Sequence, residues 1–184
     1  VAGQRFSYTV ADLTPNRSAV FGTAGTNNRY LMYVPNVASP TADPNVVYAT
    51  GFDFAGFQRF VQNSPLAKYQ GSIAPKNIGR APRFNKLDLS VRQELPFVFG
   101  GKFEVFADME NVLNFLNRDW GSLRQVAFPN FGTIANVSCA NGNNTTCPVL
   151  QYTGRAAGAF QAPAETLFIN QSIWQVRFGA RVKF

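Results

Sequence analysis

The last segment of the chain, residues 174–184, constrains the fold most, because its side chains alternate strictly between apolar and polar. The apolar positions are Trp174, Val176, Phe178, Ala180, Val182 and Phe184. The positions between them are Gln175, Arg177, Gly179, Arg181 and Lys183. Successive side chains of a β-strand point to opposite faces, so this pattern predicts a strand near residues 172–184 with one apolar face and one polar face. The length suits a tilted strand that crosses a bilayer, which needs roughly 9–11 residues.

Other segments repeat this alternation. In residues 85–96 Leu and Val side chains take alternate positions, and Gln93 interrupts the apolar side. In residues 101–114 Phe, Val, Ala and Met take alternate positions, and Phe106 interrupts the polar side. The short connection between these two segments contains a Gly-Gly turn, which predicts a β-hairpin. A shorter alternating run at residues 4–11 predicts a fourth strand.

The connections between the predicted strands differ greatly in length. The hairpin connection is short, whereas residues 12–84 and 117–171 are long. Outer-membrane barrels have short periplasmic turns and long extracellular loops, and soluble domains rarely contain long structureless loops. We therefore predict an all-β fold of about four antiparallel transmembrane β-barrel strands, part of a larger barrel, because single-chain barrels have at least about eight. A soluble β-sandwich with one wet face has the same alternation and is the alternative.

Charged side chains lie on the polar side of these strands. Those that we assign to a lumen face are Lys102, Glu104, Asp108, Arg177 and Arg181. A Lys or Arg that faced lipid at the bilayer midplane would cost about 2–4 kcal/mol, so the apolar side is assigned to lipid. Antiparallel pairing of the last two strands predicts that Glu104 lies near Arg181 and Asp108 near Arg177, each pair contributing roughly 0.2–1 kcal/mol.

The chain has two cysteines and no histidine. Cys139 and Cys147 enclose an Asn-Gly turn, which favours a disulfide in an oxidising compartment; two free thiols are the alternative. Without histidine, a Ser-His-Asp or Cys-His catalytic arrangement cannot form, and the cysteines lack partners for a zinc site. We therefore predict no catalytic site, metal or cofactor, and expect that the chain is not an enzyme. A carboxylate pair is the remaining catalytic alternative.

The formal net charge is +7, but no Lys/Arg run marks a nucleic-acid patch, so no nucleic-acid partner is predicted. No apolar stretch approaches the roughly 18 residues of a transmembrane helix. The first residues include no initiator Met or charged-then-apolar leader, so we expect an internal start within a longer protein.

Aromatic residues gather in the first long connection, at Phe52, Phe54, Phe57 and Phe60. Aromatic side chains on an outer loop are candidates for ligand contacts, and packing of the loop onto its neighbours is the alternative. Trp174 is placed at the outer end of the last strand, where barrels carry an aromatic girdle, and Trp120 is placed above the membrane.

Two parts of the chain resemble bacterial outer-membrane proteins. Residues 174–184 resemble the terminal strand that the barrel-assembly machinery recognises, with its final aromatic residue. The preceding region is similar to the C-terminal part of TonB-dependent receptors, in particular the Oar-like subgroup. The matching stretches are Tyr69–Asn77, Pro82, Asp88, Gln93, Ala107–Asn117 and Trp120-Gly121. The most diagnostic is Asp-x-x-Asn-Val-Leu-Asn at residues 108–114, whose Asn residues also suit a strand-to-loop transition.

The resemblance implies a bacterial outer-membrane barrel of about 22 strands, with a plug and a TonB-binding segment outside this chain. The expected partners are the rest of the barrel and the plug, TonB through that N-terminal part, the barrel-assembly machinery and outer-membrane lipid. The chain would be a C-terminal segment, residues 1–184, that supplies wall and closing strands for uptake of a bulky ligand. The alternatives are a self-associating structural β-module, as an oligomeric barrel or filament, and a soluble ligand-binding β-domain.

Overall fold

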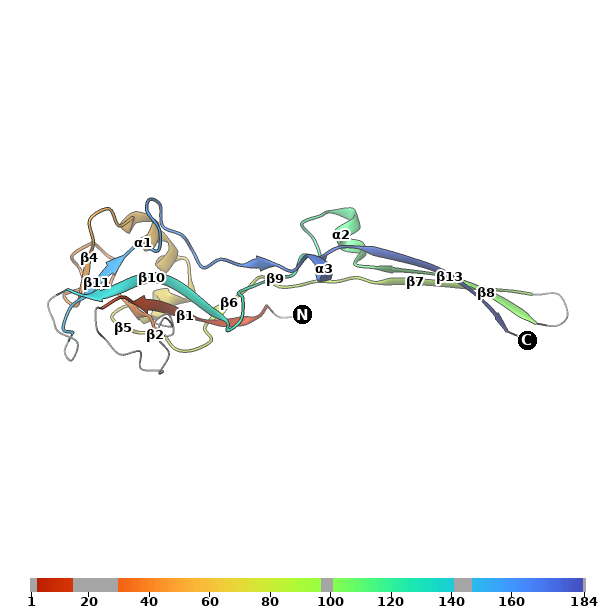
Figure 1. The fold of residues 1–184 in the computed structure, drawn as a ribbon, viewed down its shortest axis with the longest axis horizontal. Coiled ribbons are helices and arrows are strands. Elements are labelled where there is room, and N and C mark those ends of the chain that lie inside the picture. The colour runs from red at the N-terminus through yellow and green to blue at the C-terminus, as the bar shows by residue number, and fades with distance from the viewer. Residues whose placement is uncertain (1–2, 15–29, 97–100, 141–146, 184) are drawn as a thin grey trace. The chain divides into compact units, whose positions relative to one another are not determined.

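A computed structural model describes residues 3–14, 30–96, 101–140 and 147–183. Among the elements that the described residues form, β-strands predominate and the helices are few and short. The chain divides into two compact units. Unit 1 comprises Val1–Gly3, Pro82–Gln125 and Thr166–Phe184, and unit 2 comprises Gln4–Ala81 and Val126–Glu165. Figure 1 shows the elements of both units.

Unit 1 is built on a three-stranded antiparallel sheet with the order β13-β8-β7. Its strands are β7 (Leu89–Pro96), β8 (Lys102–Glu110) and β13 (Gln175–Lys183). The smaller elements of the unit are α2 (Val112–Leu116), β9 (Arg124–Gln125), β12 (Thr166–Leu167) and α3 (Ile169–Ser172). β9 and β12 form a separate two-stranded ladder. Three of the predicted strands therefore form one sheet, and within the described residues this sheet is open, not closed into a barrel.

The ends of the unit 1 strands differ from the predicted ranges. The segment predicted as a strand over residues 101–114 ends at Glu110, and α2 follows it. The segment predicted over residues 172–184 begins with the end of α3, and β13 starts at Gln175. Asn111 ends β8 because its φ of 54° lies in the left-handed region, which a continuing strand does not allow.

Unit 2 is a separate β-rich core. Its main elements are β1 (Arg5–Asp12), β2 (Tyr30–Leu31), β4 (Val46–Tyr48), β6 (Gly79–Arg80), β10 (Phe131–Cys139) and β11 (Leu150–Thr153). They form a six-stranded sheet in the order β2-β1-β10-β11-β4, with β6 paired to β1. Its other elements are β3 (Tyr33–Val34), α1 (Phe54–Gln62), η2 (Pro65–Tyr69) and β5 (Ser72–Ile73).

The predicted role of residues 4–11 as a wall strand requires correction. The segment is a strand, β1, but it pairs with β2, β6 and β10 in unit 2 and not with the strands of unit 1. Both of its faces are covered: Tyr8 and Val10 are buried on one side, and Ser7 and Thr9 on the other. A strand buried on both faces is an interior strand, and alternation alone does not reveal this.

The long connections are also not structureless. Residues from both predicted loops, 12–84 and 117–171, form the strands and helices of unit 2. β1 and β10 lie far apart in the sequence and run parallel, with Tyr8 opposite Gly132. Gln4 joins the two chain segments, since its side chain accepts a hydrogen bond from Val126 N at 3.0 Å and donates one to Asn130 at 2.6 Å.

The core of unit 2 collects apolar side chains from both segments. Its largest fully buried members are Tyr152, Phe57, Met32, Leu66 and Ile134. Full burial of one large apolar side chain contributes roughly 1.5–3 kcal/mol, so this cluster accounts for the compactness of the unit. The Tyr152 hydroxyl donates a hydrogen bond to the Tyr33 carbonyl, which satisfies a polar group that is otherwise enclosed.

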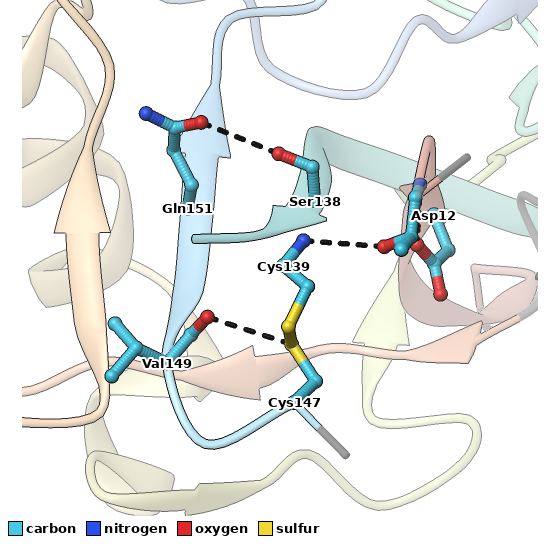
Figure 2. Close-up of a disulfide and its surroundings, with 7 residues drawn as sticks. Asp12, Ser138, Cys139, Cys147, Val149 and Gln151 are labelled. Carbon is cyan, nitrogen blue, oxygen red and sulfur yellow. Dashed lines mark hydrogen bonds between the residues drawn. A yellow bond between two sulfur atoms is a disulfide. The ribbon is translucent and has the colours of Figure 1, made fainter. Parts of the chain in front are cut away.

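The predicted disulfide between Cys139 and Cys147 is present (Figure 2). It closes the turn between β10 and β11, which pair antiparallel with Cys139 opposite Leu150. Figure 2 also shows the Ser138 hydroxyl beside the Gln151 side chain, at 3.4 Å across the two strands. The bridge therefore covalently joins the end of β10 to the segment that precedes β11.

No helix among the described residues is long and apolar enough to span a membrane.

Candidate functional site

The three-stranded sheet of unit 1 separates its side chains into two chemically different faces. In an antiparallel pair, residues directly opposite each other point to the same face. Three cross-strand rows on one face are entirely apolar: Leu89-Met109-Val176, Val91-Ala107-Phe178 and Leu95-Phe103-Val182. The remaining row contains Gln93 beside Val105 and Ala180. Gln93 is thus a single polar group within an otherwise apolar surface.

This apolar face is exposed within the described part of the chain. Phe178 is 78% exposed and Val91 is 56% exposed. The other exposed large apolar side chains of these strands are Leu89, Leu95, Val105, Val176 and Val182. A continuous apolar surface of this kind on a sheet marks a face that contacts another apolar phase or partner.

The opposite face carries the charges. Glu104 forms an ion pair with Lys183 at 2.8 Å, and Glu94 contacts Lys102 at 3.3 Å and Lys183 at 3.5 Å. Asp108 accepts a hydrogen bond from the Ser90 hydroxyl at 2.6 Å. Glu94 lies opposite Glu104, and Lys102 lies opposite Lys183, so these ion pairs join a row with two acidic groups to the neighbouring row with two lysines.

The predicted register of the last two strands is the one observed. Arg181 lies opposite Glu104, and Arg177 lies opposite Asp108. All five residues assigned to the lumen face, which include Lys102, therefore point to the same side of the sheet. Although Arg181 lies opposite Glu104, the ion pair of Glu104 is with Lys183, two residues further along β13. The sequence analysis did not single out Lys183. Whether this side faces a lumen stays a prediction.

Phe106 interrupts the charged face for a packing reason. It lies directly opposite Gly179, and a Cβ atom at Gly179 would overlap the Phe106 ring. The ring therefore covers the glycine backbone of the neighbouring strand. Covering of a strand glycine by a cross-strand aromatic residue is one way in which sheets fix their register.

The Asp-x-x-Asn-Val-Leu-Asn stretch builds the turn at the end of β8. Asn111 is fully buried, and its side-chain amide donates to the carbonyls of Gly121 at 2.9 Å and Ser172 at 2.7 Å. Its backbone N–H donates to the Asp88 carboxylate at 2.8 Å. One side chain thus joins the end of β8 to the following loop and to the residues that precede β13.

The next two Asn residues stabilise the same loop. The Asn114 amide donates to the carbonyls of Arg118 at 2.9 Å and Trp120 at 3.0 Å, and Asn117 accepts from the backbone N–H of Asp119 at 2.9 Å. The sequence interpretation that these Asn residues satisfy backbone groups at a strand-to-loop transition is therefore confirmed.

Exposed aromatic and aliphatic groups surround this end of the sheet. Trp174 and Phe115 meet edge to face with their ring centroids 5.2 Å apart, and both are exposed. Leu116, Ile169 and Ile173 are exposed nearby in α2 and around α3. Sequence reasoning named Trp174 but missed the others, because they lie in short helices outside the alternating pattern. Phe184, the last residue of the predicted assembly signal, lies outside the described residues.

The Phe residues proposed as loop ligand contacts lie mainly in the core of unit 2. Phe57 is fully buried in α1, and Phe52, Phe54 and Phe60 are partly buried against the core. Phe57 meets Phe52 at 5.4 Å and Phe160 at 5.6 Å between ring centroids. A ligand contact at Phe57 is therefore wrong, because no ligand can reach a fully buried ring, and the packing alternative describes the cluster.

Helix α1, which carries Phe54, Phe57 and Phe60, begins at a capped N-terminus. Asp53 caps it by accepting from Gly56 N at 2.9 Å, and the same carboxylate accepts from Phe160 N at 2.9 Å. These two backbone donors, Phe160 first, lower the pKa of Asp53 below its ordinary value of 3.8. Phe57 and Val61, one helical turn apart, then face the core.

Among the described residues, no group of three or more His, Cys, Asp or Glu side chains could bind a metal ion. No family model, curated protein or solved structure matches the chain.

Proposed function

We propose that the sheet of unit 1 is a section of a bacterial outer-membrane β-barrel wall, and that the chain supplies wall strands to a TonB-dependent receptor. The observation that carries this proposal is the two-faced sheet, whose apolar rows are exposed and whose other face carries the charged side chains. Transmembrane barrels need this division, because one face contacts lipid and the other a polar interior.

The lengths of the strands support the same proposal. β8 and β13 have nine residues each, and β7 has eight. A tilted strand needs roughly 9–11 residues to cross the hydrocarbon core. The exposed aromatic groups beside Trp174 lie at one end of these strands, where an aromatic girdle is expected at a lipid–water boundary.

In this proposal unit 2 is an extracellular domain built from two outer loops, and its disulfide suits an oxidising environment. The receptor as a whole would import a bulky ligand, and the residues outside this chain would provide the plug and the TonB contact. The barrel-assembly machinery would recognise β13 as the closing strand.

The open edges of the sheet favour a second candidate, a self-associating β-module. β7 and β13 each have a partner on one side only among the described residues. Such edges pair readily with other strands, which would come from the rest of a barrel or from other copies of the chain. Size measurement of the detergent-solubilised chain separates the two candidates, since self-association predicts a homo-oligomer of defined size.

Two single variants, each of which introduces an arginine, test whether the apolar face of the sheet contacts lipid. Val105→Arg places a charge on the apolar face at mid-strand and should destabilise the folded chain in lipid vesicles by about 2–4 kcal/mol in urea unfolding. Ser90→Arg is the matched control, because the new guanidinium would lie beside Asp108 on the charged face. Equal effects of the two variants would contradict the proposal.

A further inference from the structure

Unit 1 contains a cavity that neither the sheet faces nor the proposed wall function uses. Its volume is about 440 Å³, within the range of small-molecule sites. Its lining includes Arg83, Asn85, Leu113, Asp119, Trp120 and Ser122. The cavity therefore lies beside the loop that the Asn residues stabilise.

The wall of this cavity is fixed before any ligand binds. The carbonyls of Trp120 and Gly121 accept hydrogen bonds from the Asn114 and Asn111 side chains. Gly121 has a φ of 59°, and a Cβ there would overlap the Asn111 side chain, so the backbone passes closely over Asn111. Such preorganisation lowers the entropic cost of binding.

The cavity lining combines an exposed indole with three polar side chains that have no partner within the described residues, whereas the Ser122 hydroxyl donates to the Arg118 carbonyl at 3.1 Å. Trp120 is 54% exposed. The side chains of Arg83, Asn85 and Asp119 form no hydrogen bond or ion pair with the rest of the described chain. Residues with a guanidinium, an amide and a carboxylate thus line the same cavity as one exposed indole, and their hydrogen-bonding capacity is available to a ligand.

We propose that this cavity binds the pyranose ring of a saccharide. A pyranose has an apolar face of C–H groups that stacks on an indole, and a rim of hydroxyls that both donate and accept hydrogen bonds. Planar groups such as those of Arg83, Asn85 and Asp119 bind neighbouring hydroxyls in pairs. One positive and one negative side chain balance each other, so the site favours a neutral sugar over a phosphate, which requires clustered cations.

The sugar could belong to a free glycan or to the headgroup of an outer-leaflet glycolipid, because both present the same ring. The inference goes beyond the proposed function and is independent of it, since all cavity residues lie within unit 1 and none is on the apolar face of the strands.

The test uses the 184-residue chain, folded in a detergent without a sugar headgroup. Trp174→Phe leaves Trp120 as the only tryptophan, so its emission reports on the cavity directly. Methyl glycosides of glucose, galactose and mannose are titrated in parallel. We expect a saturable emission change with at least one glycoside and a Kd of about 1 mM.

Matched variants in the same background locate the binding. Arg83→Gln and Asp119→Asn should each weaken the binding by about tenfold or more, because each removes a charged group from the cavity. Arg118→Gln changes a residue of the same loop that does not line the cavity, and should leave the Kd unchanged.

The source of the sugar is tested with vesicles. Saturable binding to lipopolysaccharide vesicles, without binding to free glycosides, would assign the ring to a lipid headgroup and still support the site. Equal binding to phosphatidylglycerol vesicles would overturn it, because that lipid has negative charge but no pyranose. The absence of a saturable response to every glycoside and vesicle would overturn it as well.

Discussion

At the scale of single residues, the informative positions are those that interrupt a pattern. Phe106 breaks the polar alternation of β8, and the structure shows the cause, since its ring covers Gly179 on the next strand. Asn111 ends the same strand through its left-handed backbone and its bonds to Gly121 and Ser172. Neither role follows from alternation, because each depends on a residue far away in the sequence.

The pair formed by Phe106 and Gly179 gives a residue-scale prediction. Gly179→Val should destabilise the sheet by about 1–3 kcal/mol in urea unfolding, because the new side chain overlaps the ring. Ala180→Val, on the opposite face of the same strand, is the control and should change stability much less. Adding Phe106→Ala to Gly179→Val should recover part of the loss. If the double variant is no more stable than Gly179→Val, the ring is not the obstacle.

At the scale of elements, sequence reasoning located strands better than it assigned their partners. The alternating segments became β7, β8, β13 and β1, but β1 lies in another sheet. Its pattern of Phe6, Tyr8 and Val10 is the pattern of a wall strand, and only the burial of both of its faces distinguishes it. Burial on the second face depends on tertiary contacts, which a local pattern does not contain.

The start of α1 gives an element-scale prediction for pH. Because backbone donors lower the pKa of Asp53, its contribution to stability is present above the ordinary value of 3.8 and is lost as the pH falls through the lowered folded value. The wild type should therefore have a higher thermal midpoint than Asp53→Asn at pH 7, and the gap should narrow below about pH 4.

Near-ultraviolet circular dichroism of the Tyr and Phe side chains in the unit 2 core measures this midpoint. Glu165→Gln, at an exposed carboxylate of the same unit, is the matched control and should show no such narrowing. A constant gap between wild type and Asp53→Asn across the acid range would refute the role of the carboxylate charge.

At the scale of the whole molecule, the chain combines two kinds of construction. Unit 2 buries its apolar side chains in a core closed by a disulfide, whereas unit 1 leaves the apolar rows of its sheet exposed. The sequence predicted the exposed rows and the disulfide, because both depend on local spacing. It did not predict the folded unit 2, which forms only when segments more than 100 residues apart pair as β1 and β10.

The central claim is that the apolar face of the unit 1 sheet contacts lipid. Both native cysteines form the disulfide, so an introduced cysteine can carry a spin label alone. In lipid vesicles, a label at Phe178 should collide mainly with dissolved oxygen, and a label at Arg177 mainly with a water-soluble nickel chelate. Labels placed one by one from residue 175 to 183 should repeat this contrast with a period of two. Equal accessibility to the chelate at every position would contradict the account.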